Sequence, residues 1–112
     1  MSKKDTAQFW DTARSYLNHH LKVIRQVSSH TIDSYRDCLN SFIDYLERVE
    51  NVSRKKISFH NFEKEIIKRY QTWMITEQGL APKTCNLRLT AIRAFLEYAA
   101  QEYLWIMPLY TD

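Results

Sequence analysis

The side chains best suited to chemistry in this sequence recur at helical spacing near its C-terminal end. Four of them lie three or four residues apart and share one face of a helix: Lys83, Asn86, Thr90 and Arg93. Lysine and threonine side chains bind phosphate oxygens, and asparagine and arginine can read base edges through paired hydrogen bonds. The spacing therefore predicts a polar stripe suited to nucleic acid, flanked by Thr84 and Arg88, with a plain solvated helix face as the alternative.

A second group of short polar and basic side chains opens another predicted helix. It comprises Ser29, His30, Thr31, Ser34, Tyr35 and Arg36. Hydroxyl groups and the N-terminal amides of a helix can both reach phosphates. The serine and threonine side chains also fit as helix caps, and Tyr35 also fits the buried side of the helix, so a structural role is the alternative for each.

The charge of the chain is mildly basic and unevenly distributed. Sixteen Lys and Arg residues against thirteen acids give a net charge of +3, which permits a nucleic-acid partner without requiring one. No acid occurs between Thr12 and Ile32 or between Gln78 and Leu96. We therefore expect the acid-free sides of two long helices to form one cationic, hydroxyl-bearing surface that fits double-stranded DNA. The basic run at residues 54–56 could add phosphate contacts, but a solvated charge run is the favoured interpretation.

Catalytic and metal-binding constellations are not found in the sequence. Glu63 and Glu65 lie two residues apart, so on a helix they cannot face each other as an acid and base pair. Cys38 and Cys85 lie in helical patterns without metal-ligand spacing, and we expect two reduced thiols. We expect this chain to bind no cofactor or metal and not to act as an enzyme by itself.

Composition excludes several classes of protein. A single glycine and two prolines supply too few turn residues for a β-sandwich, and they cannot form a Gly-rich phosphate loop. No apolar run approaches the roughly 20 residues that cross a bilayer, so no membrane partner is expected. The first residues lack the apolar core of a signal peptide, which predicts a cytoplasmic protein.

Four amphipathic segments follow the 3.6-residue period and predict an all-α fold. The first begins at Asp5, the second is capped by Ser28, the third covers residues 58–78 and ends at Gly79, and the fourth covers residues 82–103. The tail, residues 104–112, is apolar without a period, and we expect Pro108 to stop any helix there. The predicted inward positions are Phe9, Ala13, Tyr16, Leu17, Leu21, Ile24, Ile32, Tyr35, Leu39, Phe42, Ile43, Leu46, Val49, Phe59, Phe62, Ile66, Tyr70, Trp73, Met74, Cys85, Leu89, Ile92, Phe95, Leu96 and Ala99.

A weak internal repeat relates the second and fourth segments. A shift of 53 residues places Thr31 on Thr84 and Phe42 on Phe95. Chance similarity between two amphipathic helices is the alternative explanation. The repeat favours two helical hairpins, each ending in a similar long helix.

Two motifs carry a resemblance to a known family. Ser28, Thr31, Tyr35-Arg36, Leu39 and Phe42 follow the pattern S-x-x-T-x-x-x-Y-R-x-x-L-x-x-F. Gly79-Leu80, Thr84, Asn86, Leu89, Ile92-Arg93 and Phe95 follow G-L-S-x-x-T-x-N-x-x-L-x-x-I-R-x-F, except that Ala81 replaces the serine. In this order and at this separation, they resemble the N-terminal core-binding domain of phage integrase family tyrosine recombinases.

The resemblance implies a SAM-like orthogonal bundle of four principal helices in two crossed hairpins. It also implies one half of a clamp around the recombination-site duplex, completed by a catalytic domain of the same polypeptide. Other recombinase protomers on the DNA are a further partner that the resemblance allows. The H-x-x-R motif of that catalytic domain does not occur in this sequence. We therefore expect residues 1–103 to be the DNA-binding domain and residues 104–112 to begin the linker to an absent catalytic domain.

Two other functions are compatible with the sequence. A helical protein-interaction module could use the apolar tail to dock a partner. A helix-turn-helix regulator could use the helix from Pro82 onward as its recognition helix.

Overall fold

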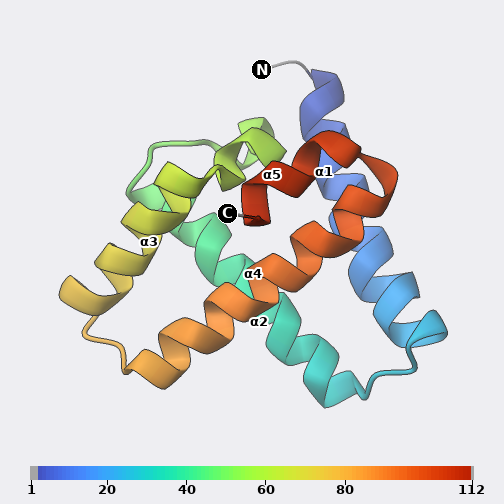
Figure 1. The fold of residues 1–112 in the computed structure, drawn as a ribbon, viewed down its shortest axis with the longest axis horizontal. Helices are drawn as coiled ribbons and strands as arrows, with labels where there is room; N and C mark the ends of the chain where they lie inside the picture. The colour runs from blue at the N-terminus through green and yellow to red at the C-terminus, as the bar shows by residue number, and fades with distance from the viewer. Residues whose placement is uncertain (1–2, 112) are drawn as a thin grey trace. The chain divides into compact units, whose positions relative to one another are not determined.

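The computed structural model describes residues 3–111, and every regular element within that range is a helix, as expected for an all-α fold (Figure 1). The chain divides into two compact units, with the boundary between Phe59 and His60. The N-terminal unit comprises the described residues up to 59, and the C-terminal unit those from 60 onward. Each unit contains a helix, a short connection and a second, longer helix, which is the predicted hairpin arrangement.

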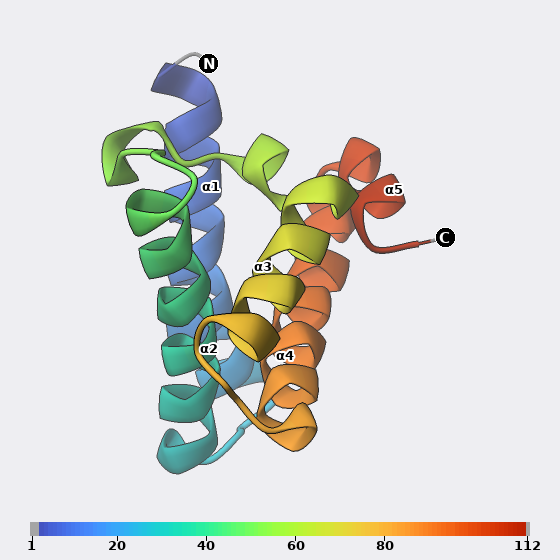
Figure 2. The ribbon, with the colours of Figure 1, turned by 90° about the vertical axis from the view of Figure 1, so that its left-hand side faces the viewer.

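The N-terminal unit contains α1 (Lys3–Ser15), η1 (Tyr16–Ile24), α2 (Ser29–Arg48) and the short η2 (Arg54–Lys56). Figure 2 shows the α1–η1 rod beside α2. Phe9 is buried on the inner side of α1 and meets the ring of Phe59 edge-on, with ring centroids 5.5 Å apart. This aromatic contact fixes the end of the connecting segment against the first helix.

The C-terminal unit contains α3 (Lys64–Thr76), α4 (Pro82–Glu102), η4 (Leu104–Ile106) and α5 (Met107–Tyr110), and η3 (Phe59–Phe62) leads into it. Pro82 occupies the first turn of α4, as predicted from its missing N–H group. Phe62 and Phe95 are fully buried, with ring centroids 6.1 Å apart, and they join η3 to α4.

Three helices are closed in the same way, by a residue with left-handed backbone shortly after the last helical residue. Gln26, Asn51 and Gly79 have φ angles of 50°, 58° and 60°. In each case the next residue donates a backbone hydrogen bond to a carbonyl six positions earlier, which closes the last helical turn. These bonds measure 2.9 Å for Val27 to Leu21, 2.9 Å for Val52 to Leu46 and 3.0 Å for Leu80 to Met74. The turns before α2 and α4 are therefore equivalent, which accounts for part of the 53-residue repeat.

The first helix differs from its prediction at both ends. It begins at Lys3, so Asp5 lies inside the first turn and is not the cap. Residues 16–24 form a π-helix with wider turns than an α-helix. The apolar period changes there, so Leu21 is buried but Ile24 is 61% exposed and Leu17 is half-buried.

The second helix confirms most of its predicted buried side. Ser28 is the N-cap, and its hydroxyl oxygen accepts a hydrogen bond from the Thr31 backbone N–H at 3.2 Å. Tyr35 is only half-buried and Val49, which follows the last helical residue, is 41% exposed, so both were wrongly assigned to the core. Cys38 and Tyr45 are buried instead.

The third segment and the tail also differ from the sequence prediction. Glu63 has extended backbone and separates η3 from α3, so residues 58–78 are not one helix. Trp73 on α3 and Leu89 on α4, both predicted to point inward, are half-buried. Pro108 lies in the first turn of α5, where a missing N–H costs nothing, and so it does not stop the helix.

The tail is anchored by side-chain packing within the C-terminal unit. Ile106 is fully buried, and the ring of Trp105 stacks on His60 with centroids 4.8 Å apart. Leu104, Trp105 and Met107 nevertheless remain 73%, 43% and 45% exposed. No helix in the described part of the chain is long and apolar enough to cross a membrane.

Candidate nucleic-acid interface

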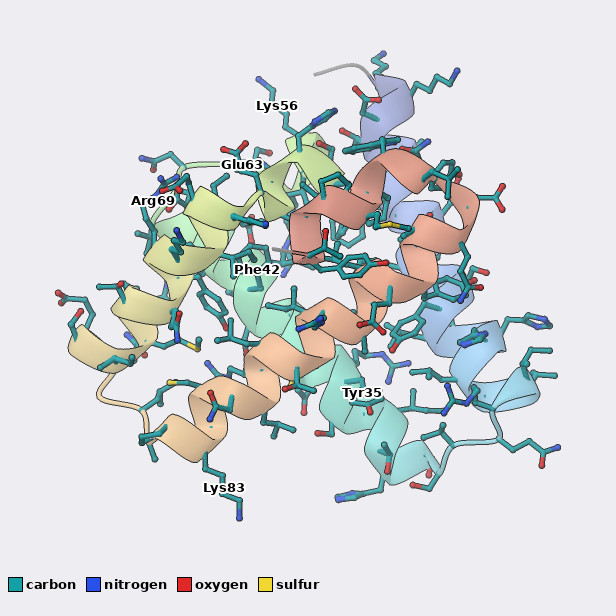
Figure 3. The ribbon with its side chains drawn as sticks, viewed as in Figure 1. Tyr35, Phe42, Lys56, Glu63, Arg69 and Lys83 are labelled. Carbon is teal, nitrogen blue, oxygen red and sulfur yellow. The ribbon has the colours of Figure 1, made fainter. Side chains whose placement is uncertain are left out.

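The polar stripe predicted from spacing is a solvent-exposed face of α4. Its members, Lys83, Asn86, Thr90 and Arg93, are all exposed. The opposite side of the helix is buried and includes Cys85, Ile92, Phe95, Leu96 and Ala99. Figure 3 shows Lys83 extending from the N-terminal end of α4 away from the ribbon. The positive end of the helix dipole therefore adds to the charge of the lysine at this end of the stripe.

Thr84 and Arg88 do not flank this stripe, which corrects the sequence interpretation. Both are half-buried. Because successive helical residues are about 100° apart, they lie on the side of α4 that also carries Ala91 and Phe95, which are buried. Within residues 3–111, no hydrogen bond or ion pair is formed by the Arg88 guanidinium.

The candidate residues at the start of α2 point in several directions. Ser29 and His30 are exposed, whereas Thr31, Ser34, Tyr35 and Arg36 are half-buried. Ser29, His30 and Thr31 are consecutive, so they cannot all face one surface. The Thr31 hydroxyl lies 3.0 Å from the Ser28 hydroxyl oxygen, which ties this side chain to the cap. The start of α2 is therefore both a cap and an exposed polar patch.

Carboxylates lie beside the key arginine of each helix, so the expectation of acid-free helix sides is wrong. Arg36 donates to Asp33 at 2.8 Å, and Arg93 donates to Glu97 at 3.2 Å. On α4 the acid-free stretch ends one residue before Glu97, and one helical turn brings Glu97 back to Arg93. On α2 Arg36 lies beyond the acid-free stretch, one turn after Asp33. Both pairs are exposed, and such pairs contribute only about 0.3–0.5 kcal/mol. A phosphate can therefore compete with either carboxylate for its arginine.

An open pocket between η1 and the start of α2 includes polar residues that the sequence did not predict for the interface. Its volume is about 350 Å³, and its polar lining residues are Asn18, Lys22, Ser29, Asp33 and Arg36. Lys22 lies in the acid-free stretch between Thr12 and Ile32, and that signal could have identified it. Asn18 carried no signal, because only the folding of η1 against α2 brings it to this pocket.

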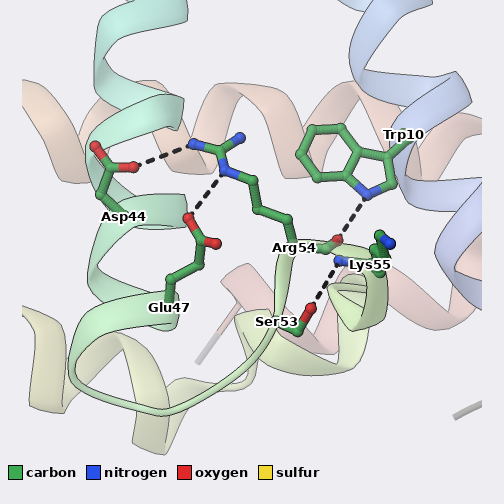
Figure 4. A network of polar contacts seen from close by, with 6 residues as sticks. All are labelled: Trp10, Asp44, Glu47, Ser53, Arg54 and Lys55. Atoms are coloured by element: carbon green, nitrogen blue, oxygen red, sulfur yellow. Dashed lines mark hydrogen bonds and ion pairs between the residues drawn. The ribbon is translucent and has the colours of Figure 1, made fainter.

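Within the basic run at residues 54–56, the first residue, Arg54, has mainly a structural role. Arg54 donates to Glu47 at 2.9 Å and to Asp44 at 3.1 Å, and its carbonyl accepts from the Trp10 indole N–H at 3.2 Å (Figure 4). Lys55 and Lys56 are exposed. The favoured interpretation of a solvated charge run holds for the lysines, whereas Arg54 joins α2 to the η2 turn.

α2 belongs to the N-terminal unit and α4 to the C-terminal unit. The single surface that both helices were expected to share therefore stays a prediction. Each unit separately presents exposed hydroxyl, amide and basic side chains near the beginning of its longer helix. Among residues 3–111, no cluster of His, Cys, Asp or Glu could hold a metal ion.

Comparison with known proteins identifies relatives among recombinases. The chain is 34% identical over 88 residues to y4rC of Sinorhizobium fredii, which carries the name integrase/recombinase. It is 26% identical over 83 residues to the tyrosine recombinase XerC of Pseudomonas savastanoi pv. phaseolicola. These matches cover 79% and 74% of the chain, and the chain spans about a quarter (26%) of the length of each relative.

No solved structure shows a significant match. The chain does match a family model, over residues 13–103. That model is described as phage integrase, N-terminal SAM-like domain. This range includes α2, α4 and every residue of the candidate interface. The chain therefore belongs to the family of phage integrase N-terminal SAM-like domains found in tyrosine recombinases.

Proposed function

We propose that this domain binds double-stranded DNA at a recombination site, with the polar stripe of α4 as its main contact. The observation that carries the proposal is the exposure of all four stripe residues on the helix that the family motif predicts. Lys83 and Thr90 are assigned to phosphate oxygens, because an ammonium and a hydroxyl suit them. Asn86 is assigned to a base edge, because its amide can form paired hydrogen bonds. Arg93 is assigned to a base edge and to the neighbouring phosphate, because its guanidinium carries five N–H donors.

The start of α2 supplies a second set of contacts in this proposal. Ser29 and Arg36 are assigned to the DNA backbone together with Lys22 from the neighbouring η1, because all three line one pocket. His30 and Thr31 face other sides of the first turn and are assigned to separate backbone contacts. Ser34 and Tyr35 are assigned to the margin of this set, because both are half-buried. On α4, Thr84 and Arg88 are assigned a contact separate from the stripe, on the other side of the helix.

The finer role is based on the relatives, which are about three times as long as this chain. We propose that the domain clamps the duplex against a catalytic domain of the full-length recombinase, and that strand exchange belongs to that catalytic domain. The H-x-x-R motif expected of such a domain does not occur in these 112 residues. Other protomers on the same DNA are the further partners in this arrangement.

The test is duplex binding by the 112-residue chain, measured by fluorescence anisotropy over a range of salt concentrations. With about four phosphate contacts, the logarithm of the affinity should fall with the logarithm of salt concentration at a slope of about −3 to −4. Lys83→Ala and Arg93→Ala should each make the slope less negative by about 1. The control is Lys55→Ala with Lys56→Ala, which removes two exposed charges outside the proposed interface. Salt-independent binding, or equal losses in the control, would contradict the proposal.

A protein-interaction module is the second candidate function. It is favoured by the exposed apolar side chains of Leu104, Trp105 and Met107. Retention on a duplex-DNA column at moderate salt separates the two functions. The DNA-binding domain should be retained, and an interaction module whose net charge is only +3 should pass through. The family match favours the integrase assignment over a helix-turn-helix regulator.

A further inference from the structure

The C-terminal unit has an apolar groove with a basic rim, of which the DNA-binding proposal uses only Arg93. The groove lies among α3, α4 and α5, which adjoin one another in this unit (Figures 1 and 2). Its floor is formed by Ile67, Leu89, Ile92, Leu96, Leu109 and Tyr110. Of these, Ile92 and Leu96 are buried, and the other four are half-buried and partly accessible to solvent.

Three cations form the rim of the groove: Lys64 and Lys68 from α3 and Arg93 from α4. No carboxylate lines the groove among the described residues. Lys64 has no ion-pair partner within residues 3–111. Lys68 and Arg93 contact Glu65 and Glu97 at 3.7 Å and 3.2 Å, but both pairs are exposed and weak.

This local positive charge does not come from the composition of the unit. Residues 60–112 contain six Lys and Arg residues and six acids, so their formal charges balance. The folding of α3 against α4 gathers three of the six cations at the rim, and none of the acids that the structure describes in this unit belongs to the lining. The groove is therefore a place where an apolar surface coincides with three basic side chains, one of them without an ion pair among the described residues and two in weak exposed pairs.

The size of the groove indicates what it can hold. Its volume is about 230 Å³, below the roughly 300–1,000 Å³ of small-molecule pockets, but enough for one or two large apolar side chains. A nucleic acid would match the rim but would cover the apolar floor with its hydrated backbone. A peptide helix matches both features, because its apolar residues at i, i+3 and i+4 can enter the floor while acids beside them reach the rim.

We propose that this groove docks an acidic amphipathic segment of a partner protein, anchored by one or two leucine-like or aromatic side chains. The carboxylates of the segment pair with Lys64, Lys68 and Arg93. The methylene chains of the two lysines cover the edges of its apolar residues. Arg93 is shared by the groove rim and the polar stripe, so the docked segment takes one cation from the DNA interface.

The experiment measures the binding of a fluorescein-labelled peptide of about three helical turns, with leucines at i, i+3, i+4 and i+7 and glutamates beside them. Two matched peptides replace either the glutamates by lysine or the leucines by alanine. The first peptide should bind the 112-residue chain, and both replacements should reduce the affinity at least about tenfold.

Charge reversal on the protein locates the site. Lys64→Glu with Lys68→Glu should weaken binding of the acidic peptide about tenfold or more, since two exposed attractions become repulsions. Lys55→Glu with Lys56→Glu is the matched control, because it makes the same charge change in the N-terminal unit and should weaken binding less than threefold. Circular dichroism of each variant verifies that the helices are retained.

Three results would overturn the proposal. Equal binding of the glutamate and lysine peptides would show that the rim selects no charge. A competition experiment in the Arg93→Ala variant tests whether DNA uses the groove. If duplex DNA displaces the peptide there, and the displacement is lost with K64E, the groove belongs to DNA. A concentration-dependent dimer in sedimentation that K64E/K68E abolishes would show that a second copy of the chain occupies the groove.

Discussion

Removing the carboxylate of Glu97 should strengthen DNA binding. Glu97 lies at the end of the polar stripe and accepts a hydrogen bond from Arg93 at 3.2 Å. A phosphate held on another edge of the same guanidinium would lie about 7 Å from the carboxylate. The repulsion between two unit charges at that distance in water is about 0.6 kcal/mol. Glu97→Gln should therefore tighten duplex binding about threefold at low salt.

The cost of this substitution to folding should be small. The side chains of Arg93 and Glu97 are 62% and 52% exposed, and an exposed pair at this spacing stabilises a helix by about 0.3–0.5 kcal/mol. For a domain of this size the midpoint of thermal unfolding should fall by about 2–3 °C. The DNA affinity and the stability should thus change in opposite directions, which a general effect on folding cannot produce.

The assay is fluorescence anisotropy with a labelled duplex at two salt concentrations, because the effect should shrink as salt screens the repulsion. Glu102→Gln is the matched control. It removes the same charge from the same helix, but Glu102 lies about 140° around the helix from Glu97 and forms no ion pair with the described residues. An unchanged or weaker affinity for Glu97→Gln, or an equal gain in Glu102→Gln, would refute the assignment of Arg93 to DNA.

Further predictions concern the helix ends that position the interface. Ser28→Ala removes the hydroxyl that caps α2 and should cost about 1 kcal/mol of unfolding free energy, whereas Ser29→Ala should cost much less. Urea unfolding followed by circular dichroism measures both changes. Equal losses would show that the capping hydrogen bond is not the cause. Gly79→Ala should destabilise the chain by about 1 kcal/mol even though no atom lies within 4 Å of the added Cβ, because its φ of 60° is unfavourable for alanine. Gln26→Gly, at a φ of 50°, should instead stabilise the chain in the same measurement, and a loss there would mean that the Gln26 side chain matters more than its backbone strain.

Local patterns in the sequence predict the helices and their faces well. Ser28 is the cap of α2, Pro82 opens α4, and Gly79 has the left-handed backbone expected after α3. The stripe residues of α4 are exposed, as their spacing predicts. These features succeed because they depend on hydrogen bonds and side-chain directions within one or two helical turns.

The errors have two sources. The π-helix at residues 16–24 moves Ile24 out of the buried side, and nothing in the periodicity of the sequence indicates it. Arg88 is half-buried, although it was expected beside the polar stripe, and the 100° step between helical residues by itself places it on the other side of α4. The first error comes from a change of helix type that spacing does not describe, and the second from applying helical spacing wrongly.

The sequence by itself determines that this protein is all helical, where α2 and α4 begin, and which side chains α4 presents to solvent. It also determines the family, because each of the two motifs lies along a single helix and the turn before it. Only the tertiary structure decides which carboxylates meet Arg54, and which residues surround the basic groove of the C-terminal unit. The physical reason is that helix formation and capping are governed by neighbours in sequence, whereas grooves and their surrounding charges are created when separate helices pack together.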